Sequence, residues 1–504
     1  QNPGDSGDAA QNSGDSGDAA QNSQESSGVD EGTIVALDTK AAPAPEENEE
    51  TVKIPVRWVC DNYDGWTADR YTFTADLGKY QYNNSSEFSL TVIVKAPSNE
   101  IARIGSTTYP TFDKAVKAAA DGDTIELLGN CTTDGMNLSK NLTVTSEEGQ
   151  TYTLNFVKDG IALWGKALTF ENCNILMNGI GSTPYVEWSW MAICANKDAS
   201  LTLNQVTMTM DAEGVTNNPH AIYFCSNNRL NLTDSTLVIR NYPQDALEWD
   251  GGDGGYNVNI TDSTFISDNN RSGFTGTFYA TIKNSDVQVI NSKGNGSNGS
   301  HFIIEESTVD FSDNGSHGLS AGELSITNSK VTANGNNGMG IAVGNALSIT
   351  DNSKVTVTDN ATNASYGYAG MRLYNNYDFT VDATSKLYIK DNHNTGLYVR
   401  QGTLTVEEGA TLEITGNSVS NTLLDGYGGG VYVGYGNNYD PTVILPTNAV
   451  ICNNHATAGG DDLYVSEGVE GPSLTFYTVG SDWVLDDCDD AIDGWYDDSP
   501  DARW

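Results

Sequence analysis

Basic residues are scarce in this chain. Its 504 residues include 25 Lys and Arg against 67 Asp and Glu, which gives a formal net charge of −42. A field of that sign repels nucleic acids, anionic membrane surfaces and polyuronate chains. No apolar run approaches the roughly 20 residues that a membrane-spanning helix needs. We therefore expect neither nucleic-acid binding nor membrane insertion.

Proline and cysteine are also few. The 13 prolines exclude a proline-rich linker protein, and the seven cysteines show neither a CxxC pair nor the spacing of a zinc site. Their odd number leaves at least one free thiol, and we expect single cysteines buried in strands rather than a disulfide framework. Charged residues make up only 18% of the chain, whereas Gly, Asn, Ser and Thr are abundant. This composition favours strands and turns over helices, so an all-β fold is predicted.

The ends of the chain differ in composition from its middle. Residues 1–50 repeat QNPGDSGDAA as QNSGDSGDAA and contain little to bury, which predicts a disordered, acidic, low-complexity linker. Residues 51–98 alternate apolar and polar positions in three short runs, which predicts a small β-domain or cap. Residues 481–504 form an acidic C-terminal segment. Because the chain starts in low-complexity sequence without an initiator Met, we interpret it as a processed, secreted product.

A repeat of about 22 residues dominates the middle of the chain. Four serines, each inside a segment such as VNITDSTF or LSITNSKV, follow one another at equal intervals: Ser263, Ser285, Ser307 and Ser329. Looser copies extend in both directions, with Asn-Gly bends and a third, glycine-led apolar run between them. Three strands and three turns per period describe one coil of a parallel β-helix, whose inner face is buried only when coils stack. We therefore predict one right-handed parallel β-helix over residues 99–480, present as a monomer.

The segment before the repeat predicts a cover for the open end of this solenoid. In residues 104–130, Phe112, Ala115 and Ala119 fall on one helical face, and Asp121-Gly122-Asp123 forms a turn into a strand. The string AVKAAADGDTIEL resembles the opening cap of pectate-lyase-like β-helices. The resemblance implies a short helix placed over the first coil.

Aromatic and acidic residues gather in the early coils, where the spacing is irregular and loops are inserted. Aromatic rings stack on sugar rings, and carboxylates bind hydroxyls or cleave the glycosidic bond. This pattern predicts a glycan site, with two indoles of a WSW segment forming an exposed shelf. The alternative is that these aromatic residues fill wider first coils and the acids lie on solvated turns. The candidate ligand-binding residues are Trp164, Tyr185, Glu187, Trp188, Trp190, Asp245, Glu248, Trp249 and Asp250.

Two further motifs favour structural roles over catalysis. The segment NGSHGLS around His317 resembles the Gly-His-Gly segment of polygalacturonases, but the acidic strings that those enzymes carry upstream are absent. A turn histidine is the preferred interpretation. Asp-rich turns such as Asp359-Asn360 and Asp461-Asp462 could bind Ca²⁺, although none has EF-hand spacing and solvated turns are favoured. No cofactor other than Ca²⁺ is expected.

The segment NNHATAGGDDLY and the acidic tail resemble parts of β-helical surface proteins of Gram-positive gut bacteria. The resemblance implies a secreted or cell-wall-associated adhesin or stalk that binds a host or dietary glycan or a host surface protein, without catalysis. Two alternatives remain open. The first is a β-helical glycoside hydrolase or polysaccharide lyase, with Asp245, Glu248 or Asp250 as its acids. The second is a passive structural spacer.

Overall fold

The computed structural model describes residues 57–60, 69–76, 89–94, 100–184, 190–225, 227–250, 257–363, 369–419, 424, 426–434, 441–466, 473–476 and 483–486. The chain divides into two compact units, residues 1–98 and 99–504. The linker predicted at residues 1–50 and most of the acidic segment at 481–504 lie outside the described residues.

The first unit contains a three-stranded antiparallel sheet. Its strands are β1 (Arg57–Val59), β2 (Asp69–Asp76) and β3 (Ser89–Val94), with β2 in the centre. Tyr71 is buried, whereas Trp58 and Leu90 are exposed. The alternating apolar and polar residues noted in the sequence at these positions therefore belong to strands.

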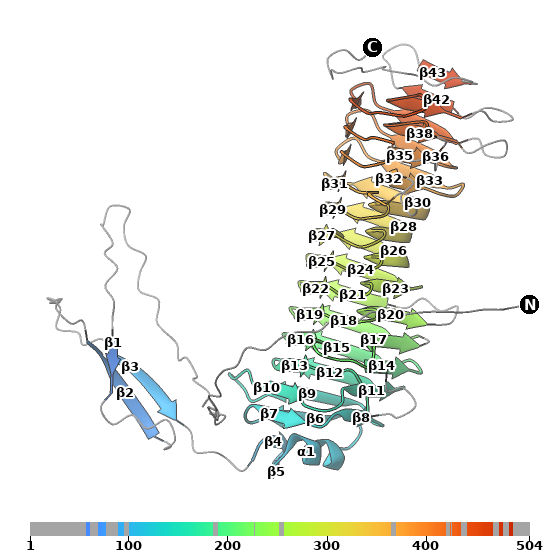
Figure 1. The fold of residues 1–504 in the computed structure, drawn as a ribbon. Coiled ribbons are helices and arrows are strands. Elements are labelled where there is room, and N and C mark those ends of the chain that lie inside the picture. The colour runs from blue at the N-terminus through green and yellow to red at the C-terminus, as the bar shows by residue number, and fades with distance from the viewer. Residues whose placement is uncertain are drawn as a thin grey trace, which may run out of the picture. The chain divides into compact units, whose positions relative to one another are not determined.

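The second unit is a right-handed parallel β-helix with three strands in each coil, which confirms the predicted fold class (Figure 1). The first strands of successive coils are β8 (Met136–Leu138), β11 (Ile161–Trp164), β14 (Met191–Asn196), β17 (His220–Cys225), β20 (Leu247–Asp250), β23 (Phe274–Gly276), β32 (Ala369–Leu373), β35 (Thr395–Val399), β38 (Val431–Val433) and β41 (Leu463–Val465). The second strands are β6 (Asp123–Leu127), β9 (Leu142–Ser146), β12 (Ala167–Glu171), β15 (Ser200–Asn204), β18 (Arg229–Thr233), β21 (Asn257–Thr261), β24 (Tyr279–Lys283), β33 (Asp378–Val381), β36 (Thr403–Val406), β39 (Thr442–Leu445) and β42 (Ser473–Phe476).

Three long strands run through both positions and join them into one 27-stranded sheet: β26 (Ser297–Glu305), β28 (Leu319–Thr327) and β30 (Ile341–Thr350). The third strands form a separate 13-stranded sheet of β7 (Cys131–Thr133), β10 (Thr153–Phe156), β13 (Asn174–Asn178), β16 (Thr207–Asp211), β19 (Thr236–Arg240), β22 (Thr264–Asp268), β25 (Asp286–Ile290), β27 (Thr308–Asp310), β29 (Lys330–Asn334), β31 (Lys354–Thr358), β34 (Lys386–Lys390), β37 (Thr411–Thr415) and β40 (Val450–Cys452). Each strand pairs in parallel with the same strand of the next coil, about 4.8 Å away.

Helix α1 (Phe112–Ala118) lies at the start of the stack, beside β4 (Ala102–Ile104), β5 (Thr107–Tyr109) and β6 (Figure 1). The Thr111 side chain caps its N-terminus by accepting a hydrogen bond from the Lys114 backbone N–H. Phe112 and Ala115 are fully buried, which confirms the predicted apolar helical face. At the other end, β43 (Trp483–Asp486) pairs antiparallel with β42.

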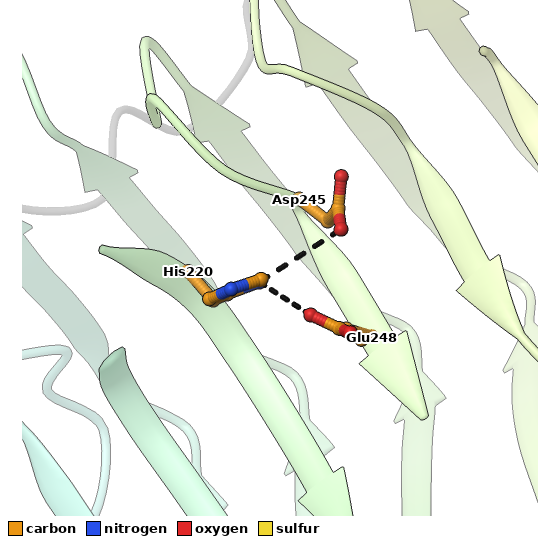
Figure 2. A group of neighbouring side chains, drawn as sticks. All are labelled: His220, Asp245 and Glu248. Atoms are coloured by element: carbon orange, nitrogen blue, oxygen red, sulfur yellow. Dashed lines mark ion pairs between the residues drawn. The ribbon is translucent and has the colours of Figure 1, made fainter. Parts of the chain in front are cut away.

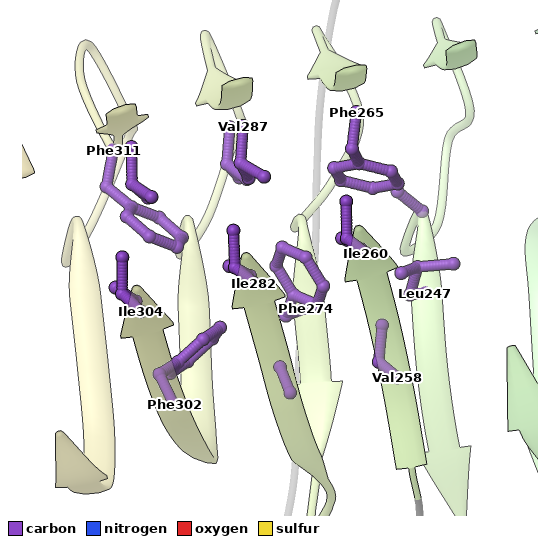
Figure 3. Packing of buried hydrophobic residues seen from close by; sticks show 14 of the residues in the cluster. Leu247, Val258, Ile260, Phe265, Phe274, Ile282, Val287, Phe302, Ile304 and Phe311 are labelled. Atoms are coloured by element: carbon purple, nitrogen blue, oxygen red, sulfur yellow. The ribbon is translucent and has the colours of Figure 1, made fainter. Parts of the chain in front are cut away.

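The core is a continuous apolar column inside the coils (Figure 3). Aromatic rings fill part of it: Phe274 lies 5.2 Å from Phe265 and 5.6 Å from Phe302 between ring centroids. Contacts of this kind contribute about 0.5–1.5 kcal/mol beyond the area they bury. The lumen therefore accepts aromatic as well as aliphatic side chains.

A serine ladder explains the regular repeat of the sequence. The Ser285 hydroxyl accepts the backbone N–H of Ser263 at 3.1 Å and donates to its own coil, to Lys283 O at 2.7 Å. The residue before each serine has a positive φ, for example 51° at Asp262. The same bond recurs along a series of serines: Ser235, Ser263, Ser285, Ser307, Ser329 and Ser353.

A second ladder, of asparagines, follows the other tight turn. The Asn336 amide accepts from the Asn314 side chain at 2.9 Å and donates to Asn360 at 2.8 Å. The series is Asn314, Asn336, Asn360, Asn392, Asn417 and Asn454. It ends at buried Asp462, whose Oδ1 accepts from Asn454 Nδ2 at 2.9 Å. The GGDD string thus terminates a buried ladder, and Asn360 and Asp462 have structural roles.

Substitution of one ladder residue should destabilise the β-helix strongly. Asn360→Ala removes the acceptor of two Asn336 donors and the donor to Ala333 O, all buried. At about 1–3 kcal/mol for each unsatisfied group, we expect a loss of about 3 kcal/mol or more in urea unfolding. The matched control is Asn298→Ala, an exposed asparagine on β26, expected to change stability by about 0.5 kcal/mol or less. Equal losses in both variants would contradict the ladder's role.

His317 is a turn histidine held in its neutral form. Its Nδ1 accepts the backbone N–H of Met339 at 3.0 Å. Burial, and then the charge of Arg372, lower the pKa of His317 below its ordinary value of 6.5. The side chain therefore acts as an acceptor inside the stack, as the structural interpretation predicted.

This environment should make folding sensitive to mild acid. The unfolded chain protonates His317 at a higher pH than the folded chain does, so stability is lost as the pH falls below about 6.5, by up to roughly 1.4 kcal/mol per pH unit. We expect His317→Gln to reduce that slope between pH 6.5 and 5, measured by urea unfolding at several pH values. An unchanged slope in the variant would show that other groups carry the dependence.

Candidate functional site

The candidate site lies on the outer face of β14, β17 and β20, the first strands of three successive coils. The register pairs Cys194 with Tyr223 and Tyr223 with Glu248. Because strand residues alternate between the two faces, Ile222 and Phe224 point into the core while Tyr223 points outward. Glu248 shares the outward column of Tyr223.

Three titratable side chains converge there, from β17 and from the turn and strand of the next coil (Figure 2). His220 Nδ1 lies 2.6 Å from Glu248 Oε2 and 3.9 Å from Asp245 Oδ2. One atom from each of the three residues falls within 4.8 Å of the other two. His220 precedes both acids in the sequence by one coil, so the stacking of coils brings the three together.

Burial dominates the electrostatics of this cluster. Asp245 is 2% exposed, and its burial raises the pKa of its carboxyl, an effect opposed by Arg271, Ser272 and His220. The Arg271 guanidinium lies 3.8 Å from Asp245 Oδ2, and its side chain is largely exposed. Asp245 Oδ1 is buried without a hydrogen-bond partner, whereas His220 Nδ1 and Glu248 Oε2 are buried and contact each other at 2.6 Å.

An exposed indole stands beside the cluster. Trp190 is 41% exposed, and its ring meets His220 and Tyr223 edge to face at 5.3 and 5.0 Å. The Tyr223 hydroxyl donates to Asp250 Oδ2 at 2.5 Å. Burial, and then this bond, raise the pKa of Tyr223. The arrangement places an aromatic surface next to three carboxyl groups, those of Asp245, Glu248 and Asp250.

The prediction that Trp249 binds a ligand is wrong. Its side chain is 3% exposed and points into the lumen, where it stacks on Phe224 at 4.5 Å and contacts Phe278 at 4.9 Å. Strand alternation is the reason, because Glu248 takes the outward position between Leu247 and Trp249. Trp164 is half-buried on β11, in register with Asn196.

The structure brings Trp190, Asp245, Glu248 and Asp250 together, as the sequence interpretation grouped them. Tyr185, Glu187 and Trp188 lie outside the described residues, so their predicted role stays a prediction. Sequence reasoning missed His220 and Tyr223. The sequence signal that could have identified them is the segment HAIYFC, because it lies one coil before DALEWD and pairs in register with it.

The cysteines near the site are not nucleophiles. Burial raises the pKa of the Cys194 thiol to about 11, and burial together with Asp250 raises that of Cys225 to about 11. A thiol with such a pKa is protonated at neutral pH and unreactive. The six cysteines that the structure describes are all thiols, as expected, but Cys60 and Cys173 lie outside strands, and three of the six are buried.

Comparisons with known proteins give no family for this chain. No protein-family model matches it, and neither does any curated protein. No helix among the described residues is long and apolar enough to cross a membrane. Two solved structures match, one of the periplasmic alginate epimerase AlgG and one of a double mutant of that enzyme. Each is 10% identical to this chain, covers 70% of it and 82% of the epimerase chain, and gives a TM-score of 0.30 or 0.29. We draw no functional argument from this likeness.

Proposed function

We propose that this chain acts on a polysaccharide at the outer face of β14, β17 and β20, and that it does so outside the cell. One observation carries the proposal: the exposed Trp190 indole lies beside two carboxyl groups, Asp245 and Glu248, that are close together and largely buried. An indole can stack on the apolar face of a sugar ring, which leaves the ring's hydroxyls and glycosidic oxygen facing the acids.

Paired carboxyl groups support bond cleavage rather than simple attachment. Glycan-cleaving enzymes place two carboxyl groups on either side of the scissile bond, about 5–10 Å apart according to mechanism. Asp245 and Glu248 are close to the short end of that range, within 4.8 Å. At this separation they can act on the bond as acid and nucleophile, or they can be ligands of an electrophilic ion. Both routes require both residues.

The second candidate is a surface adhesin that binds glycan without turnover. The ion pair between His220 and Glu248 favours it, because this contact occupies one of the two carboxylates. The Trp190 and Tyr223 surface would serve binding equally well. Attachment to a cell wall, expected from the resemblance to Gram-positive surface proteins, belongs to this candidate.

Isosteric variants should separate the two candidates. We expect the chain to release reducing sugar from a neutral plant or mucin glycan, and Asp245→Asn and Glu248→Gln each to lower kcat about 100-fold or more. Trp190→Ala should instead raise KM about tenfold, because it removes a stacking contact of roughly 1.4 kcal/mol. Cleavage is measured with a panel of polysaccharides, and binding with a glycan array.

The matched control is Glu323→Gln, which removes the glutamate of another histidine–glutamate pair, His301–Glu323, on strands further along the stack. It should leave cleavage unchanged. Binding of a glycan without cleavage, lost in Trp190→Ala, would favour the adhesin. If the chain neither binds nor cleaves any glycan, the passive spacer is the remaining alternative.

A further inference from the structure

We infer that His220, Asp245 and Glu248 form a binding centre for one divalent transition-metal ion, with Zn²⁺ as the best match. The inference deepens the proposed function, because it identifies the electrophile of the same site. The binding of the ion can be tested without any assay of activity.

The spacing of the ligand atoms fits such an ion. Zinc binds imidazole nitrogen and carboxylate oxygen at about 2.0–2.2 Å, so tetrahedral ligand atoms lie about 3.3 Å apart. The cluster provides one nitrogen with oxygens at 2.6 and 3.9 Å. These distances lie on either side of the required spacing. Small side-chain rotations would bring all three atoms to one ion.

Burial also leaves one atom of the cluster unpaired. Asp245 is 2% exposed and His220 is 9% exposed. Asp245 Oδ1 has no hydrogen-bond partner, and His220 Nδ1 and Glu248 Oε2 have only their mutual 2.6 Å contact. Buried polar groups are satisfied in nearly all native structures, so each unpaired one calls for an explanation. A cation bound between the three side chains would give the Asp245 carboxylate the partner that it lacks.

The donor set selects the type of ion. Ca²⁺, the ion expected from the Asp-rich turns, takes six to eight oxygen ligands. This cluster offers two carboxylates and an imidazole, a set suited to zinc and related transition metals. The two negative charges balance the ion, and the largely exposed Arg271 side chain can turn from Asp245 into solvent.

Three protein ligands leave a fourth position open, as in catalytic rather than structural zinc sites. Trp190, whose ring is 5.3 Å from His220, would lie beside an ion held by these residues. A bound zinc ion would polarise the glycosidic oxygen or lower the pKa of a bound water. The centre would thus put the electrophile next to the surface proposed to hold the sugar.

The chain contains its own controls. Its five histidines are all described, and three others pair with a single carboxylate: His301 with Glu323 at 3.6 Å, His393 with Asp359 at 2.7 Å and His455 with Asp461 at 3.4 Å. Within the described part of the chain, the His220 cluster is the group that unites three such ligands. Two-ligand pairs bind an ion far more weakly, because they leave most of its hydration shell in place.

The experiment is calorimetric titration of Zn²⁺ into the full chain after dialysis against EDTA. We expect one tight site per chain, and His220→Gln, Asp245→Asn and Glu248→Gln each to weaken it at least 100-fold. His301→Gln and Glu323→Gln should bind as tightly as the wild type. Thermal unfolding gives a second measurement: Zn²⁺ should raise Tm in the wild type and in the controls, but not in the three variants.

Absence of a tight site in the wild type, or equal affinity in the His220→Gln and wild-type chains, would overturn the inference. Weak binding that survives all three substitutions would be adsorption to the acidic surface, and also overturns it. Zinc binding without glycan cleavage would uphold the centre and reject the enzyme. Cleavage that EDTA leaves unchanged, with no zinc bound, would reject the centre and uphold the enzyme.

Discussion

The β-helix depends on hydrogen bonds between the side chains of one tight turn and the backbone of the next coil. A stack of parallel strands satisfies its own backbone, but each turn buries an N–H that no strand reaches. Ser285 Oγ accepts this N–H from Ser263, and Asn336 Oδ1 accepts it from Asn314. Because an unpaired buried donor costs about 1–3 kcal/mol, the ladders hold the coils that they connect, from Ser235 to Asp462, in one register.

Register in turn creates the site. His220 and Asp245 lie on adjacent coils, and a slip of the register between those coils by a single position would move Glu248 from the outer face to the lumen. The inward neighbours resist such a slip. Trp249 stacks on Phe224 directly behind the outward pair Glu248 and Tyr223. Trp249 therefore does not contact a ligand but supports, from inside the lumen, the residues that form the site.

The fold was predictable because its ladder residues recur at a constant interval. Ser263, Ser285 and Ser307 mark equal coils, and equal coils are visible without a structure. The site was predictable only in part, because it lies in coils of unequal length. The inserted turn between His220 and Asp245 conceals their register, so His220 was missed. The orientation of Trp249 was predictable from the alternation in LEWD, which places Trp249 on the same face of the strand as Leu247 and opposite Glu248.

The contrast between the ladders and the His220 cluster points to function. Within the ladders, buried amides find partners in successive coils, as Asn360 does with Ala333 and Asn392. The same stack leaves the buried Asp245 Oδ1 without a hydrogen-bond partner, next to the ion pair of His220 and Glu248. Buried unpaired atoms occur elsewhere along the stack, for example His301 Nδ1 and Ser385 Oγ, but among the described residues the His220 cluster is the group that brings three ligand-type side chains together. This local departure from the repeat, beside an exposed indole, distinguishes the site from the structural turns around it.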